Sequence, residues 1–192
     1  AVSHALESYV CTRHNAVSQL YAREAWRLLE ANFDSIFKNP TPENWGNMLL
    51  GAHFSGMAIE NSMLGAAHAC ANPLTAHFGI THGKAIAVML PAVIQYNALD
   101  PATAELYHEL MHAAGLTIRE KGDVRSLIKR VISLIATAGL PSSIRELNVP
   151  ESKLEQLAGD AAEQWTGTFN PRPVKAAELL EIYKLAYLGI KE

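Results

Sequence analysis

The apolar side chains of this chain recur with the period of an α-helix in nearly every long segment. Between residues 17 and 37, one face collects apolar residues, and the charged residues fall on the other face. The apolar set is Ala22, Ala25, Trp26, Leu29, Phe33 and Ile36. The charged set is Arg23, Arg27, Glu30 and Asp34. No segment combines a period of two with the Asn-Gly or Asp-Gly turn of a hairpin, so the chain is expected to form an all-α helical bundle.

Turn and capping residues predict where the helices begin and end. Asn39-Pro40 ends the helix over residues 17–37, because a proline cannot continue it. Thr41-Pro42-Glu43 combines an N-cap with a proline at the first helical position, which is typical of a helix start, and this helix should run to Ile59. Further helices are expected over residues 81–97, 101–114, 123–138, 151–164 and 174–188. Residues 1–192 are expected to form one helical domain.

Composition narrows the class of protein. With 49% hydrophobic and 18% charged residues, the chain can bury a hydrophobic core without the help of stabilising cross-links such as disulfide bonds. A net charge of -3 provides no positive electrostatic potential that would attract nucleic acid. No apolar stretch is long enough to span a membrane. Cys11 and Cys70 form no Cys-x-x-Cys pair. We therefore expect a cytoplasmic protein that binds neither nucleic acid nor membranes.

Two histidines fourteen residues apart, His68 and His82, stand out as candidate metal ligands. They lie on either side of an expected helix end and a glycine-containing turn, which is a typical skeleton for a metal site. A single histidine on an apolar helix more often has a structural role with a backbone partner, and this is the role expected for His14 and His53. The surrounding run is Gly65-Ala-Ala-His68-Ala-Cys-Ala-Asn72-Pro73-Leu-Thr-Ala-His77-Phe-Gly79-Ile-Thr-His82-Gly83-Lys84.

This run resembles the signature of the iron-containing (group III) alcohol dehydrogenases, whose metal is held by one aspartate and three histidines. The resemblance includes the histidine spacing, an Asn-Pro-Leu turn and the apolar helix from Ala85 to Pro91. The start, Ala1-Val-Ser-His4-Ala-Leu-Glu7, resembles the family motif Asp-Ala-x-x-His-Ala-x-Glu, and by that register the aspartate would immediately precede Ala1. Residues 138–141 and 167–173 resemble the closing segments of the family. The resemblance implies that the metal ligands are His4, His68 and His82.

The resemblance also implies a fold, a chemistry and partners. The fold would be that of the helical C-terminal domain of these enzymes. The ion, Fe(II) or another divalent metal such as Zn(II), would polarise the oxygen of a small alcohol or aldehyde during hydride transfer with NAD or NADP. Family members carry an N-terminal nucleotide-binding domain, and this chain has neither the Gly-x-Gly-x-x-Gly motif nor a strand to carry one. We therefore expect a C-terminal metal-binding domain that is nearly inactive alone. The expected partner is the nucleotide-binding domain. A homodimer is possible, and the oligomeric state stays open.

Asn72 departs from the family pattern. Many members carry a second histidine four residues after the first ligand, close to the nicotinamide and the substrate, and here that position is Asn72. Helix geometry should place Asn72 beside His68, where its amide can donate a hydrogen bond but cannot titrate. His77 is the other candidate for a place near the substrate or cofactor, although a surface histidine near a turn is the simpler interpretation.

A second motif offers a different function. The segment His108-Glu109-Leu110-Met111-His112 matches the His-Glu-x-x-His pattern of zinc peptidases. It has no third ligand at a signature spacing, and an all-helical chain offers no strand edge to align a peptide substrate. We therefore expect a solvated helix face here. A zinc peptidase stays the distant alternative, and a non-catalytic helical binding or assembly domain that merely retains its histidines is the nearer one.

Overall fold

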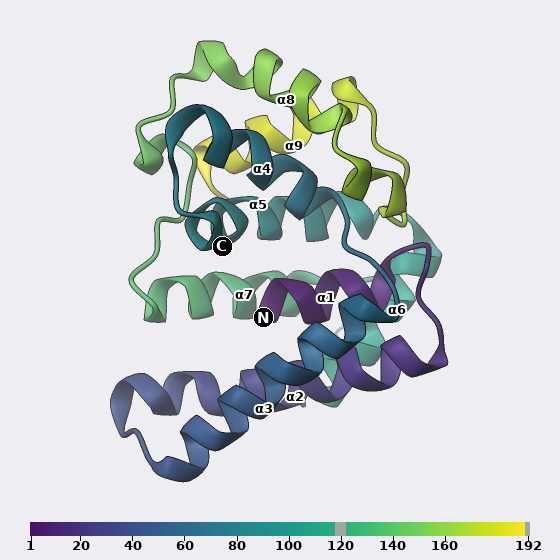
Figure 1. Cartoon of the computed structure of the whole chain (residues 1–192), viewed down its shortest axis with the longest axis vertical. Helices are drawn as coiled ribbons and strands as arrows, with labels where there is room; N and C mark the ends of the chain where they lie inside the picture. Colours follow the sequence, from purple (N-terminus) through teal and green to yellow (C-terminus); the bar gives the residue numbers. More distant parts are fainter. Residues whose placement is uncertain (118–121, 191–192) are drawn as a thin grey trace.

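The structure, a computed structural model, describes residues 1–117 and 122–190 and is built from helices joined by short connections (Figure 1). Within those ranges it contains nine α-helices and no strand, which confirms the predicted all-α fold. The α-helices are α1 Val2–Val10, α2 Ala16–Lys38, α3 Pro42–Glu60, α4 Ala66–Phe78, α5 His82–Asn97, α6 Pro101–Ala113, α7 Arg125–Thr137, α8 Leu154–Ala162 and α9 Ala176–Leu188. Three short 3-10 helices are η1 Arg145–Leu147, η2 Glu151–Lys153 and η3 Trp165–Phe169.

The N-cap side chains Asn15, Thr41 and Asp100 explain three of the helix starts. The Thr41 side chain accepts a hydrogen bond from the Asn44 backbone N–H at 3.1 Å, and Pro42 is the first residue of α3, as predicted. Asp100 caps α6 in the same way through the Thr103 backbone N–H. The range expected at 151–164 divides into η2 and α8, and the helix expected from residue 174 begins at Ala176.

The Asn-Pro-Leu turn expected around Pro73 is wrong. Pro73 lies inside α4 and is buried, and the helix continues to Phe78 before Gly79 ends it in the left-handed conformation with φ of 63°. A proline inside a helix forfeits one backbone hydrogen bond. Because α4 is buried along most of its length and packs against both α5 and α8, tertiary packing maintains the helix through the proline.

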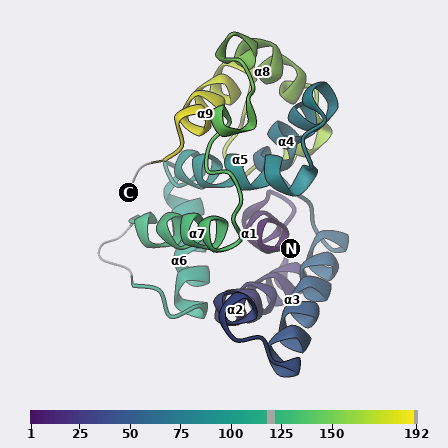
Figure 2. The same ribbon diagram turned by 90° about the vertical axis from the view of Figure 1, so that its left-hand side faces the viewer.

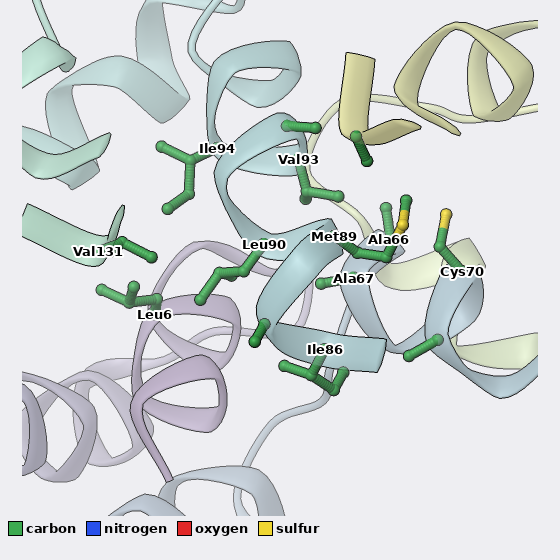
Figure 3. Close-up of a cluster of buried hydrophobic side chains, with 14 of the residues drawn as sticks. Leu6, Ala66, Ala67, Cys70, Ile86, Met89, Leu90, Val93, Ile94 and Val131 are labelled. Carbon is green, nitrogen blue, oxygen red and sulfur yellow. The ribbon is translucent and has the colours of Figure 1, made fainter. Parts of the chain in front are cut away.

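The helix α1 lies near the middle of the molecule, between the α2–α3 pair and the layer that contains α4 and α5 (Figures 1 and 2). It packs against α2, α3 and α6, while α4 packs on α5 and α8. Figure 3 shows the apolar cluster that joins these layers: Leu6 of α1 and Val131 of α7 lie close to Leu90 of α5. The core therefore surrounds α1 and holds its first turn in place.

An ion-pair network joins α2 to α7. The guanidinium of Arg130 donates to the carboxylate of Glu30 at 2.7 Å and to that of Asp34 at 2.9 Å. A third bond from Arg130 reaches the Glu30 backbone carbonyl at 3.1 Å. The charged face of α2 is thus partly covered by α7, which places the apolar side chains of α7 beside those of α1 and α5.

Two sequence expectations concern membranes and thiols. Among the helices of residues 1–117 and 122–190, none combines the length and the apolar character that crossing a membrane requires. Cys11 and Cys70 are both buried free thiols. The only two cysteines of the chain are therefore not joined by a disulfide bond.

Replacing Trp26 by alanine should lower the free energy of unfolding by about 3–5 kcal/mol, because it empties a large buried volume. Trp26 is fully buried, and its indole N–H donates to the Leu110 carbonyl at 3.0 Å, which ties α2 to α6. Trp165 is 61% exposed and provides the control, so Trp165→Ala should cost roughly 1 kcal/mol or less. Urea unfolding of both variants measures the difference, and equal losses would contradict this account of the core.

Candidate metal centre

Three histidines from three helices line one cavity of about 330 Å³. They are His4 of α1, His68 of α4 and His82 of α5. The ring centroids of His4 and His68 are 5.0 Å apart, and those of His68 and His82 are 5.3 Å apart. The structure therefore brings together the three side chains that the sequence proposes as ligands, while their binding of a metal stays a prediction.

Each histidine lies in the first turn of its helix. His4 is the third residue of α1, His68 is the third residue of α4, and His82 is the first residue of α5. The left-handed Gly79 ends α4 and turns the chain so that α5 begins three residues later. Because all three helices begin beside the same cavity, three histidines far apart in the chain converge on it.

The start of α4 is held by side chains from distant parts of the chain. Its N-cap residue, Gly65, has no side chain with which to accept a hydrogen bond. Instead, Glu7 Oε1 accepts from the backbone N–H groups of Gly65 at 3.1 Å and Ala67 at 2.9 Å. Asn170 Oδ1 accepts from the Ala66 N–H at 3.1 Å. The exposed donors of the first helical turn are thus satisfied across the fold.

Glu7 also contacts the central histidine directly. Its Oε2 makes a short hydrogen bond with His68 Nδ1. The residue is only 4% exposed and His68 is 5% exposed, so this pair is shielded from solvent. The other ring nitrogen of His68, Nε2, is buried and has no hydrogen-bond partner within residues 1–117 and 122–190. A buried nitrogen without a partner is unusual.

The sequence interpretation assigned no role to Glu7 or Asn170, although both occur in the quoted motifs. Glu7 lies three residues after His4, and this spacing places both side chains on one face of α1. A carboxylate on a buried face needs partners, which is the signal that could have identified it. Asn170 gave no comparable signal, because its partners at Ala66 and Asn97 are far away in the chain.

The surroundings favour the neutral form of His4 and His82. Burial lowers the pKa of His4 to about 3, and the charges of His68 and His82 act in the same direction. Burial is also the main reason that the pKa of His82 lies below its usual value. Neutral rings keep a lone pair on one nitrogen, which is the form that binds a metal ion.

The rest of the cavity wall is mostly apolar. Side chains from α2, α3, α5 and α7 contribute to it, together with Leu140. The apolar wall residues are Leu29, Phe33, Met48, Ile86, Ala87, Leu90, Val131, Leu134, Ile135 and Leu140. Such a wall lowers the local dielectric and so strengthens electrostatic interactions in the cavity.

The donor chemistry fits a divalent transition metal. Imidazole nitrogens bind Fe(II), Zn(II) and related ions, and three of them leave room for further ligands. In residues 1–117 and 122–190, however, no group of three or more His, Cys, Asp or Glu side chains is already arranged to hold an ion. The aspartate expected immediately before Ala1 lies outside this sequence. The three rings therefore supply suitable donors without forming a closed coordination shell.

Asn72 and His77 lie away from the cavity that the three histidines line. The Asn72 amide donates to Gln164 Oε1 at 2.9 Å, which links α4 to the residue before η3. His77 is exposed, and its Nε2 is 2.7 Å from a carboxylate oxygen of Asp160. Their expected place near substrate or cofactor stays a prediction.

The His-Glu-x-x-His segment lies in α6 and is only partly solvated. Glu109 and His112 are exposed, as expected, but the expectation of a solvated face is wrong for His108, which is buried. Packing of α6 against α1 and α2 turns His108 inward. Glu109 accepts a short hydrogen bond from the Tyr9 hydroxyl, so its carboxylate joins α6 to α1.

This chain is similar in sequence and in structure to alcohol dehydrogenases. The family model described as the C-terminal part of the Fe-containing alcohol dehydrogenase family matches residues 1–187. The 1,3-propanediol dehydrogenase of Citrobacter freundii is 30% identical over 191 residues, covering 97% of this chain and 49% of that protein. The crystal structure of a 1,3-propanediol oxidoreductase superposes with a TM-score of 0.90 at 28% identity, over 97% of this chain and 49% of the other. An alcohol dehydrogenase from Oenococcus oeni gives a TM-score of 0.90 at 26% identity, with the same coverage. The chain thus spans about half the length of these relatives.

Replacing Gly65 by alanine should destabilise the protein by roughly 1–3 kcal/mol, as overpacking typically does. An added Cβ would lie 2.9 Å from Asn170 Oδ1 and 3.2 Å from Glu7 Oε1, which would disturb both caps. Gly159, in the middle of α8, has nothing within 4 Å of an added Cβ and provides the control. Gly159→Ala should raise stability by about 0.5–1 kcal/mol. Thermal unfolding compares the two, and a neutral Gly65→Ala would contradict the proposed tight fit.

Proposed function

Because this chain belongs to the iron-containing alcohol dehydrogenase family, we propose that it is the metal-binding part of an NAD(P)-dependent alcohol dehydrogenase. The observation that supports this most is the convergence of His4, His68 and His82 on one largely apolar cavity. The substrate would be a small alcohol or aldehyde. Since the chain spans about half the length of its relatives, NAD or NADP would bind mainly to residues outside this sequence.

The roles of the residues follow from the site. The three histidines would hold the ion, Fe(II) or Zn(II), through one nitrogen each. When bound, the ion would act as a Lewis acid toward the oxygen of the alcohol or aldehyde, which favours hydride transfer. Glu7 accepts hydrogen bonds from the start of α4 and contacts His68. The apolar walls lower the local dielectric around the rings.

The alternatives explain fewer observations. A purely structural assembly domain would not account for three imidazoles from three helices that line one cavity. A zinc peptidase would need Glu109 as a free general base, but that carboxylate is hydrogen-bonded to Tyr9. A role in an alcohol dehydrogenase accounts for both the histidine cluster and the family relationship.

Protein purified without chelator should contain a divalent metal, and elemental analysis measures it. His68→Ala and His82→Ala should each reduce the metal content several-fold, because each removes one of three imidazole donors. His53 is an exposed histidine of α3, so His53→Ala is the matched control and should leave the metal content unchanged. Glu109→Gln should also leave the metal content unchanged. A metal content that follows Glu109 or His53 instead would refute this assignment.

Alcohol oxidation should be detectable as NAD(P)H formation by protein expressed from the complete gene. His82→Ala should lower kcat/KM by at least about 100-fold, because several kcal/mol of charge stabilisation depend on the ion. Short primary alcohols and diols are the first substrates to test, since relatives include a 1,3-propanediol dehydrogenase. An active enzyme whose rate is unaffected by His82→Ala would contradict the proposed role of the cluster.

A further inference from the structure

We infer that Glu7 is a positioning residue for the metal site: it fixes the His68 ring with the proton on Nδ1, so that the lone pair of Nε2 faces the other two histidines. This inference rests on the proposed function of the site, and it adds a role for a residue that binds no metal itself. It concerns which nitrogen of His68 is available, and therefore how well the site binds an ion.

Both carboxylate oxygens of Glu7 have hydrogen-bond partners. Oε1 accepts from the backbone N–H groups of Gly65 and Ala67, and Oε2 faces His68 Nδ1. A carboxylate accepts hydrogen bonds and donates none, so the ring nitrogen opposite Oε2 must carry the hydrogen. A neutral imidazole has one N–H, and Nε2 is then left as the acceptor.

The far side of the ring supports this assignment. His68 Nε2 is buried and has no partner among the described residues, so none of these residues competes for its lone pair. The neighbouring rings of His4 and His82 lie within 5.3 Å of His68, measured between centroids. Histidine ligands commonly donate their second nitrogen to a carboxylate, which orients the ring and makes it more basic.

The position of Glu7 also couples two of the three ligands. Glu7 and His4 lie one turn apart on α1, and Glu7 binds the first turn of α4, where His68 is located. A shift of α1 would therefore move His4 and His68 together. Asn170 caps the same turn of α4 through Ala66 without a hydrogen bond to His68, which separates capping from ring orientation.

The test compares Glu7→Gln with Asn170→Ala. In Glu7→Gln, the amide oxygen can still accept from Gly65 and Ala67, but the amide nitrogen would face Nδ1 as a donor and drive the proton to Nε2. The affinity for Co(II), measured by titration, should fall about 10–100-fold. Nitrogen NMR of the metal-free protein should show His68 change from the Nδ1–H to the Nε2–H form. Asn170→Ala should lower the thermal unfolding temperature and leave the His68 tautomer unchanged, with Co(II) affinity within about threefold.

The outcomes separate this inference from the proposed function. If the unmodified protein binds Co(II) and Glu7→Gln binds it equally well, the role of Glu7 is wrong and the metal site stands. If the unmodified protein binds no Co(II), the proposed metal site fails, and the NMR tautomer alone decides the role of Glu7. An Nε2–H form of His68 in the unmodified protein would overturn the inference even if Glu7→Gln fails to fold.

Discussion

The hydrogen bonds that Glu7 makes to the first turn of α4 and to His68 are the interaction on which the rest of the site depends. Helices α3 and α6 are capped by Thr41 and Asp100, which adjoin them in the chain, so those starts can form locally. Gly65 cannot cap α4, and the donors of its first turn need acceptors from α1 and from the segment after η3. The position of His68 is therefore set only when distant parts of the chain have packed together.

This arrangement also explains how the fold tolerates a buried carboxylate. Moving a charged group out of water is costly unless it is well hydrogen-bonded. Glu7 meets two backbone N–H groups and one imidazole, and the positive end of the α4 dipole lies beside it. The close fit leaves little space, since a Cβ on Gly65 would approach both caps. Glycine at this position and the buried acid depend on each other.

The local parts of the fold could be predicted, and the long-range parts could not. The start of α3 follows from Thr41 and Pro42, because capping needs only neighbouring residues. The convergence of His4, His68 and His82 was expected from their family resemblance and spacing, and the structure shows it. Glu7 as a partner of His68, Pro73 inside α4 and the burial of His108 all depend on packing between helices. A pattern read along one helix contains no information about its neighbours.

The contrast between His68 and His108 shows what makes a histidine a plausible ligand. Both residues are buried, and in the part of the chain that the structure describes neither Nε2 atom has a hydrogen-bond partner. His108 even lies in the more familiar sequence motif, yet its nearest charged partner is Glu105, 3.7 Å from Nδ1 and largely exposed. His68 has a buried carboxylate on Nδ1, and the rings of His4 and His82 lie 5.0 and 5.3 Å from its ring, measured between centroids. A metal needs several donors at one point, each with its remaining hydrogen bond satisfied. By that criterion the arrangement around His68, rather than the spacing of His108 and His112, is the better candidate for a metal site.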